Sequence, residues 1–178
     1  LRSVYGPASL IVSGADARED RWKAEAGRFR VLHLATHGVL NSANPLYSYL
    51  VLGASQGSGD DGLLEAREIL DLDLHADLVV LSACETARGR FTYGEGMVGI
   101  SWAFLVAGAP TTVVSQWKVD AASTSRLMVA FHQALATTGG PTLSGRARAL
   151  QQASLTLLQS DARHPFYWAA FTVVGNGY

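Results

Sequence analysis

The chain has 178 residues, of which 48% are hydrophobic and 16% charged, and its formal net charge is −1. This length and apolar content suit one compact domain with a sizeable core and exclude an intrinsically disordered chain. Because 14 basic residues are nearly balanced by 15 acidic ones, we expect neither nucleic acid nor an anionic membrane as a partner.

The chain contains one cysteine, so it cannot form an internal disulfide, which is typical of the reducing cytoplasm. Its first residues lack the apolar core of a secretory signal, and no apolar run reaches the roughly 20 residues of a membrane-spanning helix. We therefore expect a cytoplasmic protein. Because the sequence does not begin with methionine, we expect a single domain over 1–178 that is truncated at its N-terminus.

Apolar runs rich in β-branched residues alternate with segments of helical apolar period along the chain. In chain order they predict a strand over 8–13, a helix over 17–26 with Asp16 as N-cap, strands over 30–36 and 49–52, a helix over 63–72, a strand over 78–84, a helix over 97–106 buried on nearly all sides, a strand over 111–117, helices over 121–135 and 143–158, and a strand over 169–174. This alternation predicts an α/β fold, a sandwich with a mostly parallel sheet.

Two of the predicted strands lead into residues with reactive side chains. His37 follows one apolar run and Cys84 ends another, and polar or glycine residues follow both. Parallel strands of one sheet end at the same edge, so we expect the imidazole and the thiol to lie together there. A thiolate attacks a carbonyl carbon, and an imidazolium protonates the leaving amine. The backbone N–H groups of Gly38 and Cys84 would hold the developing oxyanion.

Two other interpretations of the same residues stay open at this point. A lone cysteine in an apolar strand is commonly a small buried hydrophobe. Cys84 and Arg90 also have the C-x₅-R spacing of cysteine phosphatases, whose loop runs straight into a helix that helps to bind phosphate. Here 91–94 separate Arg90 from the next helix, and Glu85 would place a carboxylate beside the phosphate.

The remaining histidines give no sign of a metal centre. There is no second cysteine and no pair of histidines at ligand spacing, so we expect no metal. His33 lies inside a predicted strand and is expected to be structural. The other three, His75, His132 and His164, show no partner pattern.

Five segments occur in one consistent order: HLATHG at 33–38, LSACET at 81–86, GEG at 94–96, SQWKVD at 115–120 and HPFYWAAF at 164–171. Together they resemble the CHAT domain, a caspase-like peptidase domain related to separases and gingipains and often found next to TPR repeats. The resemblance implies a three-layer, caspase-hemoglobinase-like fold. It also implies a cysteine endopeptidase in which His37 and Cys84 form the catalytic dyad, hydrolysis passes through a thioester, and no cofactor is needed.

The resemblance extends to substrate binding. It implies that Asp120 helps to form the pocket for the residue before the cleaved bond, where a carboxylate favours Arg or Lys. An N-cap for the following helix is an equal alternative for Asp120. Glu95 would support the loop or face the substrate. The implied partners are a protein or peptide substrate and a TPR-containing or regulatory region, and a non-catalytic interaction module remains the alternative function.

Overall fold

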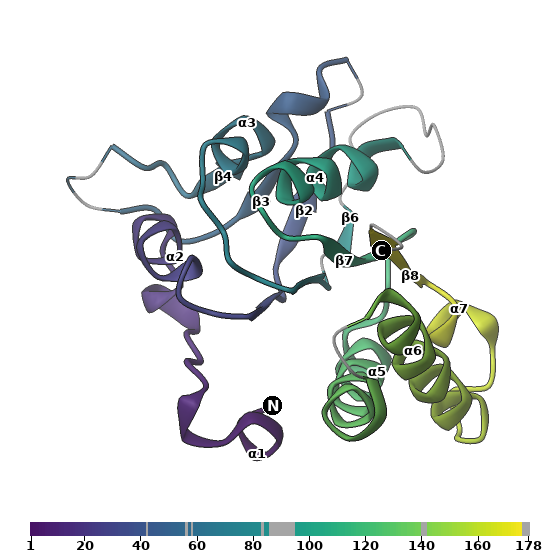
Figure 1. The fold of residues 1–178 in the computed structure, drawn as a ribbon. Coiled ribbons are helices and arrows are strands. Elements are labelled where there is room, and N and C mark those ends of the chain that lie inside the picture. Colours follow the sequence, from purple (N-terminus) through teal and green to yellow (C-terminus); the bar gives the residue numbers. More distant parts are fainter. Residues whose placement is uncertain are drawn as a thin grey trace.

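The central feature of the computed structural model is a four-stranded sheet with the strand order β1-β5-β7-β8 (Figure 1). Its strands are Val31–Leu34 (β1), Leu78–Leu81 (β5), Thr111–Ser115 (β7) and Phe171–Gly175 (β8). The first three run parallel and β8 pairs antiparallel with β7, which confirms the predicted mostly parallel sheet. The structure describes residues 1–41, 43–55, 57, 59–82, 84–85, 95–139 and 142–175, with the backbone alone at 84–85, 95–99 and 138–139.

Helices cover both faces of this sheet, which confirms the three-layer α/β sandwich. α2 (Glu19–Ala26), α3 (Ala66–Leu70) and α4 (Glu95–Val106) lie on one face, and α5 (Ala121–Ala134) and α6 (Leu143–Leu158) lie on the other (Figure 1). In β5, Val79 and Leu81 join the core on the α4 side, whereas Leu78 and Val80 join the core on the α5 side. Alternate side chains of a strand point to opposite faces, so a strand buried on both faces is apolar at every position.

A second, smaller sheet follows the carboxyl ends of β1 and β5. Its order is β4-β3-β2-β6, and its strands are Leu63–Glu65 (β4), Tyr49–Val51 (β3), His37–Val39 (β2) and Cys84–Glu85 (β6). β3 pairs antiparallel with β2 and β4, whereas β2 and β6 are parallel.

This second sheet corrects three predicted boundaries. The strand predicted over 30–36 ends at Leu34, and the strand predicted over 78–84 ends at Leu81, before Cys84 enters β6. The helix predicted over 63–72 is strand β4 followed by α3. Leu64 pairs with Leu50 and is 0% exposed, so burial beside a distant strand overrides a local pattern that is too short to separate helix from strand.

The N-terminal part corrects two further predictions. The strand predicted over 8–13 is wrong, because residues 9–13 form neither helix nor strand, and Leu10 and Ile11 are 44% and 52% exposed. A strand needs a neighbour for its backbone hydrogen bonds, and no strand of the described chain pairs with this run. The helix predicted over 17–26 begins at Glu19 with Arg18 as its N-cap, so Asp16 does not cap it.

The helix α4 is buried on one side only, against the prediction of burial on nearly all sides. Ile100 and Phe104 are 0% exposed, whereas Trp102 and Val106 are 53% and 54% exposed, because α4 belongs to an outer layer. Gly108 follows the helix with a φ of 107°, and a Cβ at this position would lie 2.2 Å from the carbonyl oxygen of Leu74. Only glycine fits there without strain.

The remaining elements are short. They are α1 (Arg2–Tyr5), η1 (Gly6–Ala8), η2 (Gly14–Asp16), η3 (Pro45–Tyr47), η4 (Leu135–Gly139) and α7 (Pro165–Trp168). α6 has the bounds that were predicted for it. β7 begins at the predicted residue and ends two residues early, whereas β8 begins two residues later and ends one residue later than predicted. Within the described parts of the chain, we find no helix of the length and apolar character that a membrane crossing requires.

Candidate functional site

His37 and Cys84 are partners in the small second sheet. β2 and β6 run parallel, with His37 opposite Cys84 and Gly38 opposite Glu85. Neighbouring strands lie about 4.8 Å apart, so the backbones of the two candidate dyad residues are in direct contact. The imidazole of His37 belongs to an exposed residue, whereas Gly38 is buried. The thiol of Cys84 lies outside the described side chains.

The central sheet brings these two residues into register. Leu34 at the end of β1 pairs with Leu81 at the end of β5. The connection from Leu34 to His37 has the same length as the connection from Leu81 to Cys84, and His37 and Cys84 pair again in the second sheet. Equal connections carry the register of one sheet into the next, whereas a difference of one residue would move one partner out of line. Ser82 supports the connection, because its N–H donates to the Leu34 carbonyl oxygen at 3.0 Å.

The other predicted site residues are placed as follows. Asp120 is the N-cap of α5, since its Oδ2 accepts the N–H of Ser123 at 2.8 Å, and this hydrogen bond lowers the pKa of the Asp120 carboxyl. Asp120 is exposed and follows the carboxyl end of β7, the strand beside β5. Glu95 is the first residue of α4, and its side chain is not among those described. Arg90, which the phosphatase interpretation needs, lies outside the described residues.

Four side chains close to this site form a chain of hydrogen bonds that no sequence pattern predicts. The Tyr5 hydroxyl lies 2.7 Å from Nδ1 of His132. Nε2 of His132 lies 3.0 Å from Nδ1 of His33, and the two rings are stacked with centroids 5.1 Å apart. Nε2 of His33 lies 2.7 Å from Oγ of Ser82. We call these four residues the histidine chain.

Burial controls the charge of the histidine chain. Burial lowers the pKa of His33 to about 4. Burial, with a smaller effect of His33, lowers the pKa of His132 to about 3. Both imidazoles are therefore neutral at neutral pH. The sequence shows no partner pattern for His132, because its partner His33 lies 99 residues away and no local pattern links the two.

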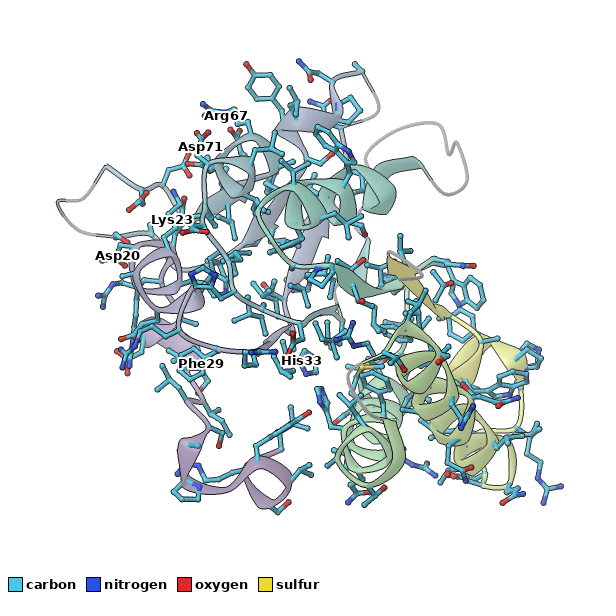
Figure 2. The ribbon with its side chains drawn as sticks, in the orientation of Figure 1. Asp20, Lys23, Phe29, His33, Arg67 and Asp71 are labelled. Carbon is cyan, nitrogen blue, oxygen red and sulfur yellow. The ribbon has the colours of Figure 1, made fainter. Side chains whose placement is uncertain are left out.

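A cavity of about 1020 Å³ opens beside the histidine chain. Its walls include the segment over 8–14, part of α2 and the strand β1, and Tyr5, His33 and His132 reach its lining. β1 is the edge strand of the central sheet, with β5 as its one strand neighbour in the described chain. Figure 2 shows His33 on the side of the sheet that faces α5.

An acidic cluster, on the side of α2 that faces away from the cavity, is an ion-pair network. Oxygen atoms of Glu19, Asp60 and Glu68 are close enough to hold a metal ion. The ammonium of Lys23 already lies among them, at 2.5 Å from Glu19, 2.8 Å from Asp60 and 3.0 Å from Glu68. A lysine cation therefore lies where a metal ion would bind, and the cluster fastens α2 to the loop before β4 and to α3 (Figure 2 labels Lys23).

Comparisons with known proteins agree with the five motif segments. Tetratricopeptide repeat protein 28 of Mus musculus is 38% identical over 117 residues. Tetratricopeptide repeat protein 28 of Homo sapiens is 33% identical over 117 residues. Each alignment covers 64% of this chain and 4% of the relative, so the chain spans a small part of these relatives' length. The family model of the CHAT domain matches residues 4–176, nearly the whole chain and all five segments, and the chain therefore belongs to the CHAT domain family.

Proposed function

We propose that this CHAT domain is a cysteine endopeptidase whose catalytic dyad is His37 and Cys84. The observation that carries the proposal is the register of β2 and β6, which sets the backbones of these two residues opposite each other. Membership of a family that resembles caspase-like peptidases supports it. A cysteine that served only for packing would not need a histidine as its register partner.

The reaction follows from the two side chains. His37 takes the proton of the Cys84 thiol, and the thiolate attacks the carbonyl carbon of the scissile peptide bond. The N–H groups of Gly38 and Cys84 stabilise the oxyanion. The C–N bond then breaks, His37 protonates the leaving amine, and a thioester remains on Cys84. Water, deprotonated by His37, attacks the thioester and releases the carboxylic acid and the free thiol.

Asp120 supports a preference for Arg or Lys before the cleaved bond. Its carboxylate is exposed, follows the carboxyl end of β7 and keeps its negative charge at neutral pH, because hydrogen bonds from the start of α5 lower its pKa. A guanidinium or ammonium group of the substrate would pair with this carboxylate. Since the relatives are named for tetratricopeptide repeats, we also propose that a repeat region presents the protein substrate to this domain.

The test is cleavage of a peptide library by the purified chain and by variants whose folding is checked by circular dichroism. Cys84→Ala and His37→Ala should each lower turnover by a factor on the order of 10³ or more, because the two groups act as a unit. His75→Ala is the matched control, since this side chain is 71% exposed and lies on another part of the chain. Wild-type turnover in Cys84→Ala would refute the dyad.

Two further experiments test the substrate specificity and the alternative, non-catalytic function. Asp120→Asn keeps an N-cap side chain for α5 but removes the charge, so the preference for Arg or Lys should disappear while the fold is retained. If the unmodified chain cleaves no library peptide and peptide chloromethyl ketones do not label Cys84, the domain is a non-catalytic interaction module.

A further inference from the structure

We propose that the histidine chain positions the carboxyl ends of β1 and β5, and through them the pair His37 and Cys84. The proposal rests on the proposed function, because it concerns how the two dyad residues are held together. It assigns a role to Tyr5 and Ser82, which no sequence motif marks as a pair.

The hydrogen bonds have a preferred direction. A neutral imidazole has one N–H donor and one acceptor nitrogen, so a ring that donates a hydrogen bond through one nitrogen accepts a hydrogen bond through the other. The Ser82 hydroxyl lies 3.5 Å from the Leu34 carbonyl oxygen, which only accepts, and 2.7 Å from Nε2 of His33. The hydroxyl therefore donates to Leu34 and accepts from the Nε2–H of His33.

The rest of the chain follows from this assignment. His33 Nδ1 is left as an acceptor, so the Nε2–H of His132 donates to it across 3.0 Å. His132 Nδ1 is then an acceptor as well, and it takes the hydrogen of the Tyr5 hydroxyl across 2.7 Å. Both imidazoles are thus Nε2–H tautomers, and every hydrogen in the chain has an acceptor. In the opposite direction, Ser82 would give its hydrogen to His33 and lose the bond to Leu34.

Ser82 is the point at which this chain acts on the site. It is bound to the end of β1 twice, because its N–H and its hydroxyl both donate to the Leu34 carbonyl oxygen. His37 lies a few residues beyond Leu34, and Cys84 lies two residues beyond Ser82. The histidine chain thus holds both strands together where they leave the central sheet, and we call this role the clamp. The helix α5 contributes to the clamp through His132, which is 0% exposed.

The first test is the direction of the hydrogen bonds. Long-range ¹H–¹⁵N correlation spectra of the ¹⁵N-histidine-labelled chain at pH 7 distinguish the two neutral tautomers and the charged ring. We expect His33 and His132 to be neutral Nε2–H tautomers, with signals assigned by loss in His33→Gln and His132→Phe. A Nδ1–H tautomer or a charged ring at either residue would overturn the assigned direction.

The second test measures whether the clamp reaches Cys84. The chain has a single cysteine, so its rate of alkylation by iodoacetamide reports on Cys84 alone. A neighbouring imidazolium increases the thiolate fraction, which is the reactive form. Ser82→Ala should slow alkylation at pH 6.5 by about tenfold, the factor that corresponds to the loss of the part-buried hydrogen bond between Ser82 and His33. Ser82→Thr keeps the hydroxyl and should restore the rate to within about twofold.

Controls separate this proposal from the dyad itself and from general loss of structure. Ser125→Ala, on the exposed face of α5, should alkylate like the unmodified chain, and His37→Ala gives the rate of an unassisted thiol. A normal rate in Ser82→Ala with a slow rate in His37→Ala would overturn the clamp and leave the dyad standing. A normal rate in His37→Ala would overturn both. If circular dichroism shows that Ser82→Ala is unfolded, Tyr5→Phe replaces it, and an unchanged rate in that variant would also overturn the clamp.

Discussion

Replacement of Lys23 by methionine gives the sharpest test of how this fold is stabilised. Glu19 is 0% exposed, and its carboxylate has two described partners, the Lys23 ammonium at 2.5 Å and the Gly62 N–H at 2.8 Å. Methionine keeps an apolar stem of similar length but removes the cation. Glu19 would then be a buried anion beside the carboxylates of Asp60 and Glu68, which repel it.

The expected loss follows from burial. Removing one member of a buried ion pair costs about 3–5 kcal/mol, because the other charge stays buried without compensation. The Lys23 side chain is 22% exposed, so water screens part of the interaction. We therefore expect Lys23→Met to lower the free energy of unfolding by about 2–4 kcal/mol at pH 7.

The pH dependence of this loss has a definite sign. Burial alone lowers the pKa of Lys23, but hydrogen bonds with Asp60, Glu19 and Glu68 outweigh it and raise the pKa above its ordinary value. A raised lysine pKa stabilises the fold fully below the unfolded pKa, and the stabilisation is lost only as the pH rises through the folded pKa. The deficit of Lys23→Met should therefore be constant between about pH 6 and 9, which lies below the unfolded pKa of lysine.

Urea denaturation followed by circular dichroism measures this effect by linear extrapolation. The control is Lys118→Met, because Lys118 is the other lysine of the chain and is exposed, so its replacement should change little. Adding Glu19→Gln to Lys23→Met should recover more than about 1 kcal/mol, since the two residues are coupled. A loss in Lys23→Met no larger than in Lys118→Met would refute the reasoning.

Two further predictions concern the ends of helices. Gly108→Ala should lower the free energy of unfolding by more than the roughly 1–2 kcal/mol that a left-handed backbone costs, because the new Cβ would also lie 2.2 Å from the Leu74 carbonyl oxygen. The control in the same urea assay is Gly14→Ala, since Gly14 has a φ of 59° and a Cβ there would have no atom within 4 Å. Equal losses in the two variants would contradict the clash. Asp120→Ala should lower stability at pH 7 by removing the N-cap bond to Ser123. Because the fold lowers the pKa of Asp120, its stabilisation is present above the unfolded pKa and is lost as the pH falls through the folded pKa, so the deficit should shrink as unfolding curves are taken at lower pH. A deficit that does not change with falling pH would contradict the cap.

Several parts of the fold could be predicted because their signals are local. The run Leu78–Leu81 is apolar at every position, which is what burial on both faces requires, and α6 follows the helical period from its first residue to its last. The N-cap alternative for Asp120 depends on side chain and backbone within three residues, and the structure contains that bond. The five motif segments also lie in the sequence itself, and they indicated the family to which the chain belongs.

Long-range pairing explains what the sequence pattern missed. The run over 8–13 has the composition of a strand, but no described strand pairs with it. No local pattern links His132 to His33, although the fold brings the two rings together. The apolar run predicts that Trp102 is buried, but α4 belongs to an outer layer and Trp102 lies on its exposed face. Each of these properties depends on neighbours that are distant in sequence, so a window of local residues does not contain the information.

Local residue patterns are enough to predict the α/β class, the family and the candidates His37 and Cys84, because residue type and apolar period are local properties. The tertiary structure alone decided that the two residues are register partners, because that depends on equal connections from Leu34 and Leu81 into a second sheet. The hydrogen bonds of His33 with Ser82 and His132 also depend on the tertiary structure, since hydrogen bonds between groups far apart in the chain form only once the strands have paired.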